Sequence, residues 1–133
     1  MKSDPSFQKK HNEVSGAILN CCIRVHTELG PGLLESIYEA VLAHELVKLG
    51  HSVRRQQPMP IVYDGLVFEE GYRIDILVDD LVVVEIKSVE ALAPVHYKQV
   101  LTYLKLSGKK VGLLVNFNEN LLKDGFKRLV NDL

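Results

Sequence analysis

The sequence predicts an α/β sandwich in which helices flank a central mixed β-sheet. Two segments with apolar residues at helical spacing open the chain, and consecutive strand-like runs follow them. A third helical segment then separates the last of these runs from another buried strand. Such a helix is a crossover, so it places two parallel strands in a sheet whose other neighbours are antiparallel.

The first half of the chain is predicted to hold two helices. Apolar residues recur at helical spacing over residues 12–28. The next four residues break the pattern, because Gly30 suits a helix C-cap and Pro31 cannot continue the helix. A second helix is expected over residues 33–49, where Gly50 closes it.

The middle of the chain reads as a series of strands. They are expected at residues 52–57, 61–63, 66–78 and 82–87, with a turn at Asp64-Gly65. Pro94 fits the first turn of a third helix over residues 94–106. A short buried strand at residues 111–116 and a last helix over residues 121–130 complete the prediction.

Composition places the chain among ordinary globular proteins. Its 133 residues are expected to form a single domain, and the contents of 47% hydrophobic and 25% charged residues are typical. No apolar run is long enough to span a bilayer, and residues 1–5 show no signal-peptide core, so no membrane partner and a cytoplasmic location are expected. Cys21 and Cys22 are adjacent, which predicts small buried residues and no disulfide or zinc site.

Asp75 and the triplet Glu85-Ile86-Lys87 carry the strongest functional signal, because charges interrupt two otherwise apolar strands. Side chains alternate along a strand, so Glu85 and Lys87 share one face. The expected antiparallel register pairs Ile74 with Ile86, Ile76 with Val84 and Val78 with Val82. It places Asp75 opposite Glu85 and leaves residues 79–81 as the connection. Two carboxylates and an ammonium there are suited to holding a hard divalent cation and a water, which predicts hydrolysis of a phosphodiester.

Weaker candidates lie on the helices. Glu35 and Tyr38 are three apart on the second helix, although a glutamate in a first turn also favours the helix dipole. His96, Gln99 and Tyr103 form a polar stripe on the third helix, which is either an exposed face or the wall of a cleft beside Lys87. His26, taken alone, reads as a helix-end histidine.

Together these residues resemble the PD-(D/E)XK nuclease superfamily, and specifically its small GxxExxY proteins. The resemblance covers residues 14–118, and it departs from the superfamily motif at Ile74, where that motif has proline. The matching positions are Gly32, Glu35 and Tyr38, preceded by His26 and residues 29–31, then Asp75, Glu85-Ile86-Lys87, and Gln99 with Tyr103 as the Q-x-x-x-Y element.

The resemblance implies a restriction-endonuclease-like three-layer sandwich over residues 1–133, with a core at about 12–131. It also implies a magnesium-dependent nuclease ancestry. Asp75, Glu85 and the Ile86 carbonyl are expected to bind Mg²⁺ or Mn²⁺, and Lys87 to orient the attacking water. Glu35 is expected to reach the metal through a water or to help place a second ion. Gln99 and Tyr103 are expected to position the phosphate, with possible support from His26, Tyr38, Arg73 and His96.

Two alternatives remain open at this point. Asp75, Glu85, Lys87 and Arg73 can form an ion-pair network without a metal. The chain can also be a non-catalytic module that binds a protein or nucleic acid, which its net charge of −1 favours because a nucleic-acid binder is expected to be basic. Nucleic acid, with DNA ahead of RNA, is the expected partner, and a homo-oligomer is plausible.

Overall fold

The computed structural model describes residues 5–132. The outermost residues of the expected domain, 1–4 and 133, lie outside the described part, as does most of the N-terminal segment considered above. The elements in chain order are α1 (Pro5–Leu29), α2 (Glu35–Lys48), β1 (Val53–Tyr63), β2 (Leu66–Val78), β3 (Val82–Lys87), α3 (Pro94–Ser107), β4 (Val111–Asn116), the 3₁₀ helix η1 (Leu122–Gly125) and β5 (Phe126–Val130).

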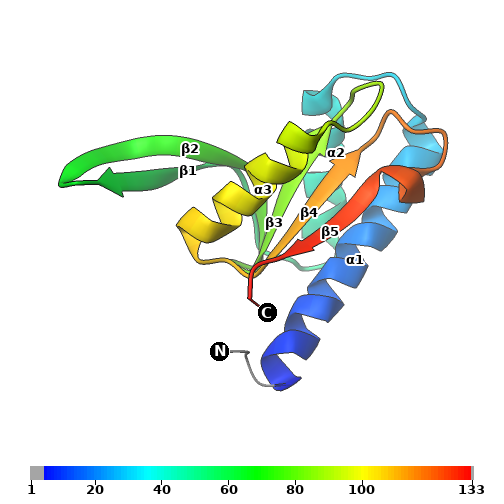
Figure 1. Ribbon diagram of the computed structural model, residues 1–133. Coiled ribbons are helices and arrows are strands. Elements are labelled where there is room, and N and C mark those ends of the chain that lie inside the picture. The colour runs from blue at the N-terminus through cyan, green and yellow to red at the C-terminus, as the bar shows by residue number, and fades with distance from the viewer. Residues whose placement is uncertain (1–4, 133) are drawn as a thin grey trace.

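The five strands form one mixed sheet in the order β1-β2-β3-β4-β5 (Figure 1). Strands β3 and β4 are parallel and all other neighbours are antiparallel, because α3 crosses over between β3 and β4. Helices α1 and α2 pack on one face of the sheet, where their buried side chains and those of Val84 and Leu113 form the larger core, which we call the α1/α2 core. The smaller core on the other face, beneath α3, is called the α3 core. Helix α3 covers the opposite face, where Val100 and Leu104 pack on Val83 and Leu114. The predicted three-layer α/β architecture is therefore confirmed.

Helix α3 approaches β4 closely at Gly112. A Cβ atom at this position would lie 2.6 Å from Cγ1 of Val100 and 3.3 Å from both Cδ atoms of Leu104. Both side chains are fully buried, so neither can move aside without disturbing the α3 layer.

We expect Gly112→Ala to lower the free energy of unfolding by about 1–3 kcal/mol, because the added methyl overpacks this contact. Denaturant unfolding measures the change. Gly16→Ala is the matched control, since Gly16 lies within α1 and its added Cβ would meet nothing within 4 Å. The control is expected to stabilise the protein by about 0.5–1 kcal/mol. Equal stability of Gly112→Ala and the wild type would contradict the close approach.

The end of the chain differs from the prediction. Residues 121–130 were expected to form a helix, but the structure has η1 and then β5, which pairs antiparallel with β4. The prediction is wrong because this segment pairs with β4, and its side chains therefore alternate between the two faces of the sheet. Phe126 packs against the α1/α2 core and Leu129 against the α3 core. Pairing with β4 also covers a sheet edge that a helix would have left open.

The connection between β2 and β3 has the predicted three-residue length, with Val78 paired to Val82. Its left-handed backbone comes from Asp79 (φ 54°) and Asp80 (φ 55°) rather than from Leu81. Aspartate tolerates this conformation better than most residues, which explains how the turn forms without glycine.

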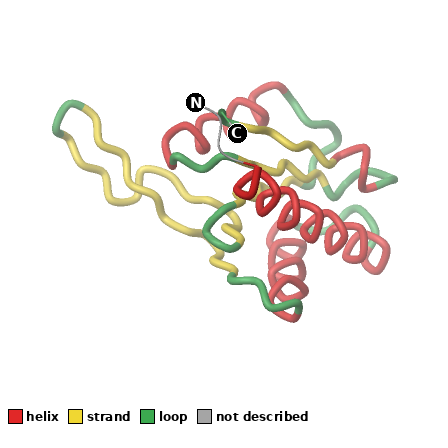
Figure 2. The backbone as a smooth tube through the Cα atoms, turned by 90° about the horizontal axis from the view of Figure 1, so that it is seen from below, coloured by secondary structure: helices red, strands yellow, loops and turns green. Residues whose placement is uncertain are grey.

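The β1–β2 hairpin extends well beyond the sheet (Figures 1 and 2). β1 is one continuous strand where two separate pieces were expected, and its register shifts between Met59 and Ile61. Asp64 and Gly65 both have positive φ and form the predicted turn at its tip. We call residues 59–72 the hairpin arm. β2 pairs with β3 only from Ile76 to Val78, so the hairpin diverges from the rest of the sheet on the arm side of Ile76.

Candidate active site

Two carboxylates bridge β2 and β3 at the point where the strands separate. The backbone ladder between the strands ends at the pair Ile76–Val84. Beyond it, the Asp75 N–H donates to Oε2 of Glu85 at 2.8 Å, and the Ile86 N–H donates to Oδ2 of Asp75 at 2.9 Å. Side-chain oxygens thus take the place of backbone carbonyls, and both acids are drawn into the fork between the strands.

The side-chain alternation of β2 breaks at Asp75. With the regular alternation assumed for the predicted register, Ile74, Ile76 and Val78 would share one face of the sheet, but Ile74 packs in the α3 core whereas the other two pack in the α1/α2 core. That part of the prediction is wrong because β2 no longer has a backbone partner on β3 at this point, so the strand can twist there. Asp75 consequently borders a cavity beneath α2 instead of sharing a face with Leu77 in the α3 core.

The two acids stand in an environment that disfavours their charges. Glu85 is only 3% exposed. Its burial, and after that the nearby charge of Asp75, raise the pKa of Glu85 to about 8. Burial also raises the pKa of Asp75, with the charge of Glu39 adding to the effect and the hydrogen bond from Ile86 opposing it. The Lys87 ammonium opposes both shifts. A bound cation would relieve this repulsion.

A cavity of ≈ 430 Å³ opens beside Asp75. Its lining includes three residues that the sequence analysis missed, namely Glu39, Arg55 and Gln56. Glu39 is 6% exposed and accepts hydrogen bonds from Nε of Arg55 at 3.0 Å and Nε2 of Gln56 at 2.6 Å. Its position four residues after Glu35 places both acids on one side of α2, a spacing that was visible in the sequence.

Gln56 links two of the three acids that line this cavity, Glu39 and Asp75. Its Nε2 donates to Oε1 of Glu39 and also to Oδ1 of Asp75 at 3.2 Å. Its backbone has φ 47°, which is uncommon for a residue other than glycine. A neutral amide donor therefore separates two carboxylates that would otherwise repel each other.

We expect Gln56→Glu to destabilise the protein near neutral pH more than Gln56→Met does, by about 1 kcal/mol. Both variants remove the amide donor, but only the glutamate adds a further acidic side chain to a cavity that already has Glu35, Glu39 and Asp75. Urea unfolding of both variants measures the difference, which is expected to narrow in acid as carboxylates become protonated. Equal destabilisation of the two variants at neutral pH would contradict the bridging role.

Helix α3 brings Gln99 and Tyr103 to the α3 side of the fork. Nε2 of Gln99 lies 3.2 Å from the Tyr103 hydroxyl, and the Tyr103 ring stacks on Tyr72 with centroids 4.6 Å apart. Burial and then the charge of Glu85 raise the pKa of Tyr103, so this hydroxyl is close to the acid pair. Oε1 of Gln99 is buried without a hydrogen-bond partner, which leaves an acceptor available to a ligand.

Glu35 lies at the rim of the same cavity. Its Oε2 accepts a hydrogen bond at 3.1 Å from the N–H of Ser88, the residue after Lys87. The structure thus brings together Asp75, Glu85, Lys87, Glu35 and the Gln99–Tyr103 pair.

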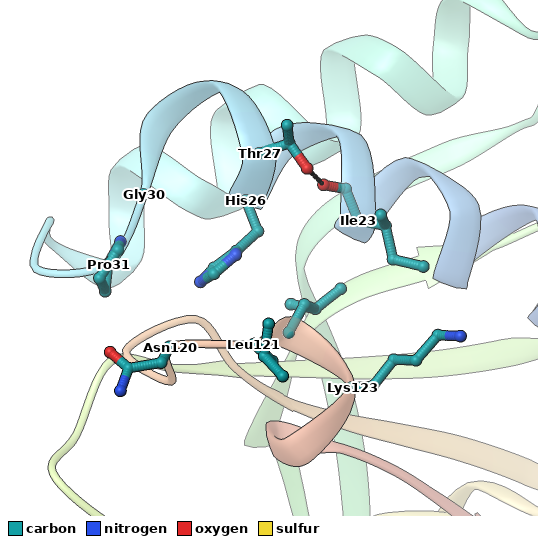
Figure 3. Close-up of a pocket in the computed structure, with 9 residues that line it drawn as sticks. Ile23, His26, Thr27, Gly30, Pro31, Asn120, Leu121 and Lys123 are labelled. Atoms are coloured by element: carbon teal, nitrogen blue, oxygen red, sulfur yellow. Dashed lines mark hydrogen bonds between the residues drawn. The ribbon is translucent and has the colours of Figure 1, made fainter.

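The other candidates have local partners of their own. The Tyr38 ring stacks on Phe117, and its hydroxyl donates to the Gly30 carbonyl at 2.6 Å. Nδ1 of His96 accepts the Ala93 N–H at the start of α3. Arg73 pairs with Glu70 on the hairpin arm. Nε2 of His26 lies 2.7 Å from the Glu119 carbonyl oxygen, in the cavity of ≈ 490 Å³ shown in Figure 3.

The larger cavity around His26 is mainly apolar, so its volume alone does not make it the active site. The smaller cavity is lined by Asp75, whose pKa is raised, together with Glu35 and Glu39, so its chemistry makes it the better candidate for the active site. Among residues 5–132, no ion pair joins Lys87 or Arg73 to either acid of the fork, so the simple ion-pair network is not present.

The donor set fits a hard divalent cation. Within the described residues, no group of three His, Cys, Asp or Glu side chains is arranged as metal ligands. Magnesium needs only one or two protein carboxylates, because water and substrate phosphate supply the remaining oxygens. The half-buried Asp75 and the buried Glu85, both with raised pKa values, meet that requirement.

A mixed sheet between helical layers, with an acid pair and a lysine at the β2–β3 fork, defines a nuclease-type α/β fold. The chain belongs to the PD-(D/E)XK nuclease superfamily, whose family model matches residues 12–129. No curated protein and no solved structure matches the chain significantly. None of the helices described at residues 5–132 is long and apolar enough to cross a membrane.

Proposed function

We propose that the protein is a metal-dependent nuclease of the GxxExxY group, which hydrolyses phosphodiester bonds in nucleic acid, with DNA favoured over RNA. The observation that carries the proposal is the pair of half-buried Asp75 and buried Glu85 at the fork, next to Lys87. Two adjoining carboxylates whose pKa values are raised, with a cationic side chain beside them, suit a site for Mg²⁺ or Mn²⁺.

In this proposal Asp75, Glu85 and the Ile86 carbonyl hold the cation. When bound, the cation supplies Lewis-acid chemistry, lowering the pKa of water and neutralising phosphate charge. Lys87 donates hydrogen bonds to the attacking water and to the charge that develops on the phosphate. The Gln99 amide and the Tyr103 hydroxyl, already joined to each other, orient the scissile phosphate. Glu35 fixes the backbone after Lys87 through Ser88.

A Mn²⁺ titration followed by calorimetry tests the metal site. We expect saturable binding by the wild type and at least about tenfold weaker binding by Glu85→Ala, because one of two protein carboxylates is lost. Glu90→Ala serves as a control, since Glu90 is an exposed acid in the loop after β3. Absence of binding, or equal binding by the wild type and Glu85→Ala, would contradict the proposal.

A non-catalytic nuclease-fold module is the second candidate. It is favoured by the absence of a three-ligand cluster among the described residues and by the net charge of −1. Such a module would bind a protein or nucleic acid without Mn²⁺-dependent cleavage, so the titration and a cleavage assay together separate the two functions.

A further inference from the structure

The hairpin arm exposes a cluster of large apolar side chains. Five of them near its tip are between 52% and 72% exposed. They are Val62, Tyr63, Leu66, Val67 and Phe68. A contiguous apolar patch of this kind on a water-soluble surface commonly marks an interaction site.

Both faces of the arm are apolar. Directly paired residues share a face, and successive pairs alternate between faces. Val62 pairs with Val67 on one face, and Tyr63 pairs with Leu66 on the other. A two-stranded hairpin with neither face covered is only marginally stable in water. The arm therefore has a physical reason to be enclosed by a partner.

The charge of the arm indicates what kind of partner this is. Residues 59–72 contain Asp64, Glu69 and Glu70 and no lysine or arginine; Arg73 at the base of the arm pairs with Glu70, which leaves a net charge of −2 over residues 59–73. Phosphate groups of nucleic acid or of an anionic bilayer would be repelled by this surface. Prolines at 58 and 60 interrupt hydrogen bonding along the free edge of β1, so the partner meets the faces of the arm.

A complementary surface lies at the other end of the same molecule. Two cavities, of ≈ 490 and ≈ 380 Å³, lie between α1 and the chain segment of η1 and β5. We call this surface the α1–β5 groove; Figure 3 shows its larger cavity. Its apolar lining comes from Leu19, Ile23, Leu121 and Phe126.

The groove has the opposite charge to the arm. Residues 123–128 contain Lys123 and Arg128 against the single acid Asp124, while Lys127 alternates with Phe126 and faces the other side of the sheet. Lys123 and Arg128 line the two cavities themselves. The arm starts from β1 and β2, at the opposite edge of the sheet from β5, so a chain cannot fill its own groove (Figure 1).

We propose that the hairpin arm of one copy docks in the α1–β5 groove of a second copy. The apolar tip fills the apolar lining, and the acids beside the tip face the cations of the groove. If two copies exchange arms, the contact closes into a dimer and doubles the area that one arm buries, toward the roughly 800 Å² per partner of a standard interface. This inference goes beyond the proposed function and does not depend on catalysis.

Sedimentation velocity over a concentration series tests the proposal with charge-reversal variants. We expect the wild type to self-associate, and Lys123→Glu and Glu69→Lys each to raise the dissociation constant by about tenfold. The double variant restores the opposite charges and is expected to associate within about threefold of the wild type, because coupled pairs are not additive. Phe68→Ser is expected to abolish association.

Val47→Ser is the matched control for Phe68→Ser, since Val47 is 58% exposed on α2 and lies outside both surfaces. Circular dichroism confirms that each variant is folded. A wild type that stays monomeric at all concentrations would overturn the proposal and favour a different protein partner. Additive losses in the double variant would also overturn it, because they would show that Glu69 and Lys123 do not face each other.

Discussion

Asp75→Ala and Lys87→Ala are each expected to abolish Mg²⁺-dependent cleavage of nucleic acid while the protein remains folded. Asp75 supplies one of the two carboxylates at the fork, and Lys87 supplies the ammonium group beside them. Loss of a preorganised electrostatic group of this type costs about 100-fold or more in rate. A gel-based cleavage assay on single-stranded and duplex DNA and on RNA, with Mg²⁺ and with Mn²⁺, measures the effect.

Asp75 also has a structural task, so its variants need a control. Asp75→Asn keeps an oxygen that can accept the hydrogen bond from the Ile86 N–H, but it removes the charge. We expect Asp75→Asn to unfold at nearly the wild-type denaturant concentration and to be as inactive as Asp75→Ala. Cleavage at the wild-type rate by Asp75→Asn or Lys87→Ala would refute the roles assigned to these residues.

The second large effect is on the pH dependence of stability. Without divalent ions, the free energy of unfolding is expected to fall as the pH rises from about 5.5 to 8. The pKa of Glu85 is raised from 4.5 to about 8 in the folded protein, mainly by burial. Between these values the folded state holds a proton that the unfolded state has lost. Unfolding therefore releases a proton, and rising pH favours it.

The slope from this group is at most about 1.4 kcal/mol per pH unit, and the raised pKa of Asp75 acts in the same direction. Thermal unfolding in buffers containing a chelator measures it. Glu85→Gln has no proton to release, so this variant is expected to lose most of the slope and to exceed the wild type in stability at pH 8.

Added Mn²⁺ should raise the melting temperature of the wild type more at pH 8 than at pH 5.5, because the ion competes with protons for the same carboxylates. A stability that is flat or rises over this pH range would show that Glu85 is ionised in the folded protein. The pH profile and the cleavage assay thus examine the acid pair by independent routes.

Much of the fold follows from local patterns. Apolar periodicity and the glycine and proline breaks indicated α1, α2 and α3, and strand alternation indicated the register around Ile76 and Val84. Residues 121–130 were misassigned because β5 forms only by pairing with β4, and a strand of five residues leaves little periodicity of its own. Tertiary pairing outweighed local propensity there.

The site was predictable where chemistry stands out against an apolar background. Asp75, Glu85 and Lys87 interrupt apolar strands, so their types and spacing were visible in the sequence. Glu39 and Gln56 were missed because they lie on a helix and on a strand rich in polar residues, where one more polar residue carries no signal. The crossing of Ile74 to the α3 core depends on the fork itself, which alternation alone cannot reveal.

The paired hydrogen bonds at the fork give Asp75 and Glu85 a structural role in addition to the catalytic role proposed for them. Each acid joins one strand to its neighbour through the same carboxylate that the proposed chemistry would use. A related protein without hydrolytic activity would still need both side chains to hold β2 and β3 together. The presence of both acids in a relative therefore indicates a shared fold before it indicates enzymatic activity. In the part of the chain that the structure describes, the Lys87 ammonium makes no hydrogen bond of this kind between the strands. Position 87 is therefore more informative for distinguishing an active enzyme from an inactive relative.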